Sequence, residues 1–174
     1  GRSASYICRR GMMGREHHTD IAVQAAVITV STSRTEKTDL SGKILREAFE
    51  NAGMAVVFQT LVPDNEEQIS AAVLAALEAA NCVVVTGGTG LTHDDCTIEA
   101  VTPLFEKTMD GFGELFRQKS YAQVKTAVLL SRATAGLIRG AAVFCIPGSP
   151  KAVQLAAEEI IIPEIRHILT HAGQ

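Results

Sequence analysis

The chain has 174 residues, of which 47% are hydrophobic and 20% charged, and its formal net charge is −3. This length and apolar content suit one globular domain with its own core. The slight negative charge, an aromatic content of 5% and the lack of tryptophan argue against a nucleic-acid surface. No apolar run reaches the length of a membrane span. We therefore expect neither nucleic acid nor a membrane among the partners.

The first nineteen residues differ in character from the rest. They carry Arg2, Arg9, Arg10, Arg15 and the pair His17–His18, and they lack the apolar core of a secretory signal. We interpret 1–19 as a flexible leader or an expression remnant, and 20–174 as a single domain. The histidine pair has no third ligand nearby in the sequence, which favours a solvated tail over a metal site.

Strands and helices are predicted to alternate from residue 22 onward. Mostly apolar runs predict buried strands at 22–30, 54–61 and 82–85. Between them, helical spacing predicts helices at 40–49 and 66–80, and Gly53 suits the residue after the first helix. Such alternation implies right-handed crossovers and a mostly parallel sheet.

The pattern is less regular beyond residue 96. A helix is expected from 97, with an interruption at Pro103. Residues 110–113, with two glycines, are interpreted as a break before a short helix at 114–121. Residues 128–130 fit either a strand or a buried helix.

The last third of the chain predicts a strand pair and a helix. Residues 137–138 and 141–146 are expected to form a hairpin or strand pair about Arg139–Gly140. Ser149 suits an N-cap and Pro150 the first position of the final helix. Pro163 predicts a kink or restart within that helix.

A glycine-rich turn follows the predicted strand at 82–85. Gly87, Gly88 and Gly90 allow left-handed backbone angles and close approach of a ligand. A turn of this kind between a strand and a helix exposes backbone amides to an anion. Asp94 and Asp95 come next, and phosphate chemistry commonly needs a carboxylate that can hold a divalent cation. The segment therefore indicates a nucleotide or phosphate site.

The four cysteines show no metal-binding spacing. Cys82 and Cys145 lie within apolar runs and are expected to be small core residues. Nothing in the sequence is typical of secretion, so we expect reduced thiols and a cytoplasmic location. Cys96 follows Asp95, whose negative charge disfavours a thiolate, and no other residue is an evident covalent nucleophile.

Several short motifs occur in the order found in one known family. They are Ser31–Arg34 with Asp39 and Gly42, Val62–Asp64, Thr86–Gly90, Asp95–Thr97, Gly111–Glu114, Ser131–Gly136 and Pro147–Pro150. From about residue 22 to the C-terminus the chain resembles the molybdenum-cofactor biosynthesis family that contains MoaB, MogA and the gephyrin G domain. The motifs at 132–136 and 147–150 are nearer to the MoaB branch than to MogA.

This resemblance implies a fold and an activity. The fold is a three-layer α/β/α sandwich with a mostly parallel central sheet, assembled as a homo-oligomer, either a trimer or a hexamer. The activity is adenylylation of molybdopterin: the pterin phosphate attacks the α-phosphate of ATP, with Mg²⁺, and pyrophosphate leaves. Two alternatives are a protein of this fold that binds molybdopterin without adenylylating it, and a relative of the MoeA or CinA domains. The short chain argues against the second.

The resemblance also implies two catalytic and metal-binding carboxylates, Asp64 and Asp95. Both follow predicted parallel strands, where α/β sheets place ligands. Two carboxylates from separate loops can hold Mg²⁺ against ATP oxygens. The structural alternatives are an N-cap for Asp95 and an Asx-turn for Asp64. Asp94 departs from the family pattern and is either a bystander or a modifier of the metal site.

The remaining implied site residues are expected to hold substrate through hydroxyls and backbone amides. They are Ser31, Ser33, Thr86, Gly87, Gly88, Thr89, Gly90, Glu114, Ser131, Gly148 and Ser149. Their structural alternatives are turn residues, helix caps and an ordinary surface glutamate. Lys151 can add positive charge near Gly148 and Ser149. Arg132 fits either an anion ligand or a surface ion pair.

Overall fold

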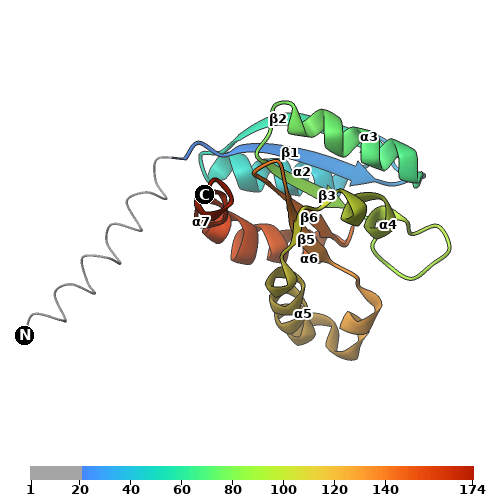
Figure 1. Ribbon diagram of the computed structural model, residues 1–174. Coiled ribbons are helices and arrows are strands. Elements are labelled where there is room, and N and C mark those ends of the chain that lie inside the picture. The colour runs from blue at the N-terminus through green and yellow to red at the C-terminus, as the bar shows by residue number, and fades with distance from the viewer. Residues whose placement is uncertain (1–20) are drawn as a thin grey trace, which may run out of the picture.

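The computed structural model describes residues 21–174, which form one central sheet with helices on both faces (Figure 1). The sheet has six strands in the order β2-β1-β3-β6-β5-β4. In chain order the strands are β1 (Gln24–Val30), β2 (Ala55–Val62), β3 (Cys82–Thr86), β4 (Lys107–Thr108), β5 (Thr134–Ile138) and β6 (Ala141–Ile146). Strands β2, β1, β3 and β6 pair in parallel, whereas β5 pairs antiparallel with β6 and β4 antiparallel with β5.

The α-helices are α2 (Leu40–Asn51), α3 (Glu66–Leu77), α4 (Thr97–Val101), α5 (Asp110–Val124), α6 (Pro150–Ala156) and α7 (Ile162–Ala172). Two short 3₁₀ helices, η1 (Thr102–Leu104) and η2 (Lys125–Leu130), follow α4 and α5. A π-helical segment, η3 (Ala157–Ile161), separates α6 from α7.

Alternating side chains of the central strands divide the core in two. On β3, Cys82 and Val84 pack with α2, α5, α6 and α7, whereas Val83 and Val85 face α3 and α4. All four side chains are fully buried, because a parallel sheet covered on both faces leaves its central strands no solvent side. The expected three-layer α/β/α sandwich with a mostly parallel sheet is confirmed.

Local signals placed several boundaries correctly. Gly53 follows α2 with a φ of 76°, as its expected position after the helix requires. The hairpin between β5 and β6 turns at Arg139 and Gly140, whose φ angles are 52° and 78°, and two consecutive positive φ values define the type I′ turn that fits a strand pair. The hydroxyl of Ser149 caps α6 by accepting the amide of Ala152 at 3.3 Å.

The expected break at 110–113 is wrong. Helix α5 runs without interruption from Asp110 to Val124. Phe112 is buried in its first turn, with its ring 5.1 Å from that of Phe144, and Gly113 packs so closely that a β-carbon there would lie 2.7 Å from the carbonyl oxygen of Ala133. Tertiary packing thus overrides the low helix propensity of the two glycines.

The two readings of 128–130, a strand or a buried helix, are also wrong. These residues end the 3₁₀ helix η2, and Leu129 and Leu130 are 77% and 60% exposed. In Figure 1, α5 and η2 extend away from the sheet, so the apolar residues at this tip have no core of their own chain to enter. The predicted disturbance at Pro163 is confirmed, because the chain passes through η3 just before that proline.

The prediction of a leader at 1–19 lies outside the described residues. None of the helices within residues 21–174 has the length and apolar character needed to cross a bilayer.

Candidate functional site

Two glycine turns meet at the carboxyl ends of β3 and β6. Because these strands pair in parallel, their ends lie side by side, and the amide of Gly87 donates to the carbonyl of Ile146 at 2.9 Å. A β-carbon on Gly148 would lie 3.3 Å from the α-carbon of Gly87. The turn after β3 and the turn after β6 therefore form one continuous surface, at the edge of the sheet where α/β folds bind ligands.

The first turn requires glycine at two positions. Gly87 and Gly88 have φ angles of 100° and 69°, which side-chain-bearing residues rarely adopt. A β-carbon on Gly87 would collide with the carbonyl oxygen of Val30, and one on Gly88 with the hydroxyl of Thr97. The turn thus depends on close packing against β1 and α4 as well as on backbone freedom.

The backbone amides of this turn divide into two groups. The Gly87 amide is used by the bond to Ile146, so it serves the architecture and not a ligand. Within residues 21–174, no acceptor takes the amides of Gly88, Thr89 or Gly90. Those three amides form the part of the turn that can cradle an anion.

Buried hydroxyls fasten the two turns to each other and to the helices. Thr86 donates to the carbonyl of Pro147 at 2.9 Å, Thr97 to that of Gly87 at 2.7 Å, and Ser41 to that of Gly148 at 2.6 Å. The Thr86 hydroxyl, predicted to bind substrate, is therefore engaged in holding the turns together. Each bond satisfies a carbonyl that the irregular backbone would otherwise leave unpaired.

Arg132 braces the first turn from the outside. Its Nε donates to the carbonyl of Gly90 at 3.0 Å, and its two terminal nitrogens make a bidentate pair with Glu99 at 2.6 and 2.9 Å. The hydrogen bonds from this guanidinium lower the pKa of Glu99. Of the two alternatives for Arg132, the geometry matches the ion pair, with the added role of satisfying turn carbonyls.

Asp95 folds back onto its own loop. Its Oδ2 accepts the amide of Thr92 at 3.0 Å and the Thr92 hydroxyl at 2.7 Å. The N-cap alternative is not supported, because the residue at the N-cap of α4 is Cys96 and no side chain caps that helix. Since both bonds go to Oδ2, the carboxylate is oriented and Oδ1 accepts no bond from any described residue.

Asp64 ties the ends of β1 and β2 together. Its Oδ2 accepts the Thr32 hydroxyl at 2.7 Å, and its amide donates to the same hydroxyl at 3.2 Å. As with Asp95, one carboxylate oxygen is used and the described residues leave the other without a bond. His93 and Asp94 are exposed on the wide loop that follows β3 (Figure 1).

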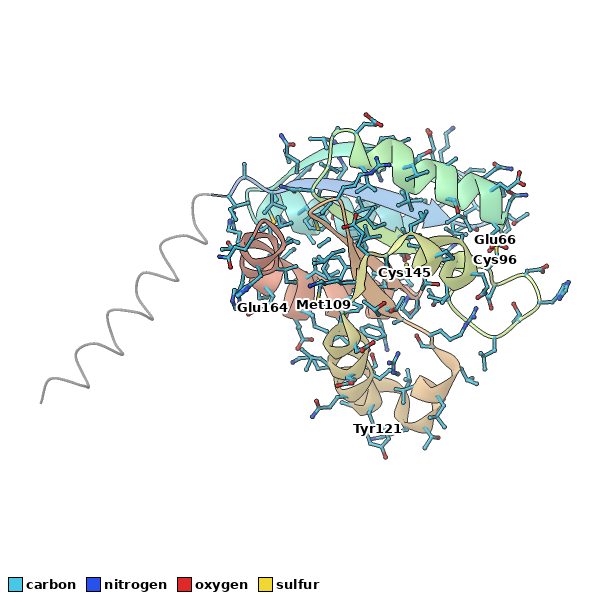
Figure 2. The ribbon with its side chains drawn as sticks, in the orientation of Figure 1. Glu66, Cys96, Met109, Tyr121, Cys145 and Glu164 are labelled. Carbon is cyan, nitrogen blue, oxygen red and sulfur yellow. The ribbon has the colours of Figure 1, made fainter. Side chains whose placement is uncertain are left out.

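The Cys96 thiol lies in the field of the carboxylates. Burial raises its pKa most, and Asp64, Glu66, Glu99 and Asp95 raise it further. Figure 2 shows Cys96 and Glu66 near each other beyond α4. The expected suppression of the thiolate is confirmed in direction, although Asp95 is the weakest contributor. No group of three or more His, Cys, Asp or Glu side chains suited to a metal occurs in residues 21–174.

A cavity of about 790 Å³ opens beside the two turns. Its wall combines the turns with α5, η2 and the start of α6, and three charged residues reach it: Asp95, Arg117 and Lys151. Much of the remaining wall is apolar and comes from α5 and η2 (Phe116, Val124, Ala127, Val128 and Leu130). The volume lies within the usual range for small-molecule sites.

Ser120 is a residue of this cavity that the sequence did not reveal. It lines the wall, is 8% exposed, and its buried hydroxyl has no hydrogen-bond partner among residues 21–174. Buried hydroxyls without a partner are rare in folded proteins, and a bound ligand is one reason for them. A serine on a helix carries no sequence signal, so only the packing of α5 against the turns identifies it.

The predicted substrate-binding residues separate into two groups. Those that line the cavity are Gly88, Thr89, Gly90, Ser131, Gly148 and Ser149, together with Asp95. Those that do not line it are Ser31, Ser33, Thr86, Gly87, Glu114 and Asp64. Ser31 accepts the amide of Arg34 at 3.2 Å in the loop after β1, and Glu114 is exposed on α5.

Comparison with known proteins identifies one family. Residues 26–167 match the family described as a probable molybdopterin binding domain. The chain is 45% identical over 150 residues to molybdenum cofactor biosynthesis protein B of Bacillus subtilis, covering 84% of this chain and 88% of that protein. It is 42% identical over 147 residues to the Escherichia coli K12 protein of the same name, covering 83% and 86%.

A solved structure gives the same result in three dimensions. The tungsten cofactor synthesizing protein MoaB from Pyrococcus furiosus superimposes with a TM-score of 0.80 at 42% identity, covering 88% of this chain and 98% of that one. The family match at 26–167 spans both glycine turns. The chain belongs to the molybdopterin-binding domain family of molybdenum cofactor biosynthesis proteins, within the MoaB group.

Proposed function

We propose that this protein binds molybdopterin in the cavity beside the two glycine turns and adenylylates it with ATP and Mg²⁺. The observation that carries the proposal is the cavity itself, which joins unpartnered turn amides to an apolar wall and an oriented carboxylate. The amides of Gly88, Thr89 and Gly90 suit a phosphate, and the wall of α5 and η2 suits a flat ring system.

The donor set supports a magnesium ion better than a softer metal. Asp95, which lines the cavity, and Asp64, which lies outside its lining, each present a carboxylate with one oxygen held by a threonine and the other without a bond from a described residue. Mg²⁺ is typically bound by one or two carboxylates together with substrate phosphates and water, and carboxylate oxygens are the donors that these two residues supply. When bound, Mg²⁺ would neutralise charge on the phosphates.

The protein residues contribute positioning and charge. The turn amides hold a phosphate in place, Lys151 at the cavity wall offsets negative charge, and the apolar wall excludes water from the reacting groups. The phosphate of the pterin acts as nucleophile, its oxygen bonds to the α-phosphorus of ATP, and the bond to the departing pyrophosphate breaks. No side chain is required to form a covalent intermediate.

One assay tests the adenylylation. The purified full-length protein is incubated with molybdopterin, ATP and Mg²⁺, and adenylylated pterin and pyrophosphate are quantified. We expect both products in equal amounts. Tight binding of molybdopterin without any product would refute the enzyme and favour the alternative, a binding protein of the same fold.

Asp95→Asn separates a chemical role from a structural one. The amide keeps a carbonyl oxygen for the Thr92 bonds but loses the charge that a cation needs. We expect turnover to be abolished while molybdopterin binding and thermal stability stay near those of the wild type. Asp94→Asn, on the exposed part of the same loop, is the matched control and should retain activity. Loss of binding and of stability together in Asp95→Asn would make Asp95 a structural residue.

The proposal extends to a homo-oligomer. Large apolar side chains of α5 and η2 are exposed in the single chain, including Tyr121 at 51% and Leu129 at 77%. A second copy covering them would remove apolar surface from water and close the open side of the cavity. Analytical ultracentrifugation should give a trimer or hexamer, and Leu129→Lys should shift it toward the monomer. A wild-type monomer at assay concentration would refute this part.

A further inference from the structure

Two histidines on the last helix lie in a geometry suited to a metal ion. The Nε2 atoms of His167 and His171 are 3.0 Å apart, and the ring centroids are 4.7 Å apart. Residues four apart on a helix share one face, so both imidazoles project to the same side of α7. The opposite side of α7 is anchored by Ile165 and Leu169, which are 0% and 6% exposed. The pair is therefore carried by a fixed element.

The separation of the two nitrogens matches two adjacent ligands of one ion. With metal–nitrogen bonds of about 2.0–2.1 Å, two imidazole nitrogens lie roughly 2.9 Å apart at a right angle and roughly 3.3 Å apart at a tetrahedral angle. The observed 3.0 Å lies between these values. The same distance also accommodates one hydrogen bond between the two rings. A bound metal ion would take the place of the proton in that bond.

Glu164 sets the tautomer that metal binding requires. Its Oε2 lies 3.1 Å from Nδ1 of His167, and an ionised carboxylate can only accept, so His167 donates from Nδ1. In the neutral ring the lone pair is then on Nε2, the atom that faces His171. A carboxylate behind a metal-binding histidine is the usual outer partner of such ligands, because it orients the ring and increases its basicity.

The surroundings leave room for water ligands. A hollow of about 370 Å³ lies between α7 and β4, lined by both histidines, Glu164, Lys107 and Met109 among others. Figure 2 shows Glu164 and Met109 beside each other at this place. Lys107 and Glu164 both line this hollow, where the ammonium would oppose a cation and the carboxylate would favour one. Within residues 21–174 no group of three or more His, Cys, Asp or Glu side chains suits a metal ion, so these two imidazoles would be the protein ligands that α7 supplies and water could take further positions.

We propose that His167 and His171 form a site for a divalent first-row transition metal ion, separate from the cavity at the glycine turns. Two imidazoles with water as the remaining ligands favour Cu²⁺ above the other ions of this series. The site lies on α7, which lines no part of the larger cavity, so it does not depend on the proposed adenylylation.

The test is a Cu²⁺ titration of the full-length protein, followed by calorimetry and by electron paramagnetic resonance. We expect one bound ion with hyperfine coupling to two nitrogens. His167→Gln and His171→Gln should each remove this signal, and Glu164→Gln should weaken binding about tenfold. Circular dichroism on each variant checks that the fold is kept, which is expected because all three side chains are exposed.

Controls remove the other histidines of the chain. His93→Gln, on the exposed loop, should bind Cu²⁺ like the wild type. The double variant His17→Gln and His18→Gln should keep the two-nitrogen signal. Loss of the signal in that double variant, or its persistence in His167→Gln and His171→Gln, would overturn the proposal. Unchanged affinity in Glu164→Gln would refute the orienting role of the carboxylate.

Discussion

Replacing Gly87 by alanine should lower the free energy of unfolding more than the same change at Gly140. Both residues have positive φ angles, 100° and 78°, so both substitutions force an L side chain into a disfavoured conformation. That strain costs about 1–2 kcal/mol in either case. The difference comes from space: a β-carbon at Gly140 meets nothing within 4 Å, whereas one at Gly87 collides with the backbone oxygen of Val30.

The collision has a calculable cost. Val30 ends a central strand and cannot move without disturbing the sheet, so the overpacking adds about 1–3 kcal/mol at Gly87. We expect Gly140→Ala to lose about 1–2 kcal/mol of unfolding free energy and Gly87→Ala about 2–5 kcal/mol. For a chain of this size, the larger loss lowers Tm by roughly 10 °C.

Urea denaturation and thermal unfolding of both variants measure this difference. Molybdopterin affinity should fall in Gly87→Ala, because the turn must shift away from β1, and should stay unchanged in Gly140→Ala, whose hairpin does not line the cavity. Equal destabilisation by the two substitutions would refute the reasoning, because it would mean that the contact of the added β-carbon with Val30 does not lower the free energy of unfolding.

Three further predictions test the site and its surroundings. Arg132→Met should lower the unfolding free energy by about 1–2 kcal/mol, because it leaves turn carbonyls and Glu99 without their partner. Arg46→Met removes an exposed ion pair with Glu50 and an exposed hydrogen bond to Gln59, and should cost less than about 1 kcal/mol. Chemical denaturation compares the two, and equal losses would contradict the bracing role. Ser120→Ala should weaken molybdopterin binding about fivefold without lowering Tm, because the buried Ser120 hydroxyl has no hydrogen-bond partner within residues 21–174. A lower Tm with unchanged affinity would refute a ligand role for this hydroxyl. Burial raises the pKa of Cys145 to about 12, so this thiol should resist labelling at pH 8 until the protein unfolds. Cys96, whose pKa is also raised, should react slowly before it. Mass spectrometry of the labelled peptides reports the order, and early labelling of Cys145 would contradict its burial.

Local chemistry made most of the fold predictable. Apolar runs of strand length that alternate with helices are typical of the central strands of a sheet covered on both faces, and β1 and β3 agreed with this expectation. The paired turn at Arg139–Gly140 and the cap at Ser149 are likewise signals carried by a few adjacent residues. The prediction failed at 110–113, where burial of Phe112 against Phe144 outweighs the propensity of two glycines, and at 128–130, where apolar residues face outward.

The fold class, the two glycine turns and the family could be predicted from the sequence, because they depend on short motifs and on their order along the chain. Which groups of the site remain available to a ligand depends on contacts between distant parts of the chain. The amide of Gly87 and the hydroxyl of Thr86 are used by backbone partners some sixty residues away, at Ile146 and Pro147, whereas Ser120 is left without a partner. Hydrogen-bond satisfaction depends on atoms that are distant in sequence, so no local pattern can reveal it.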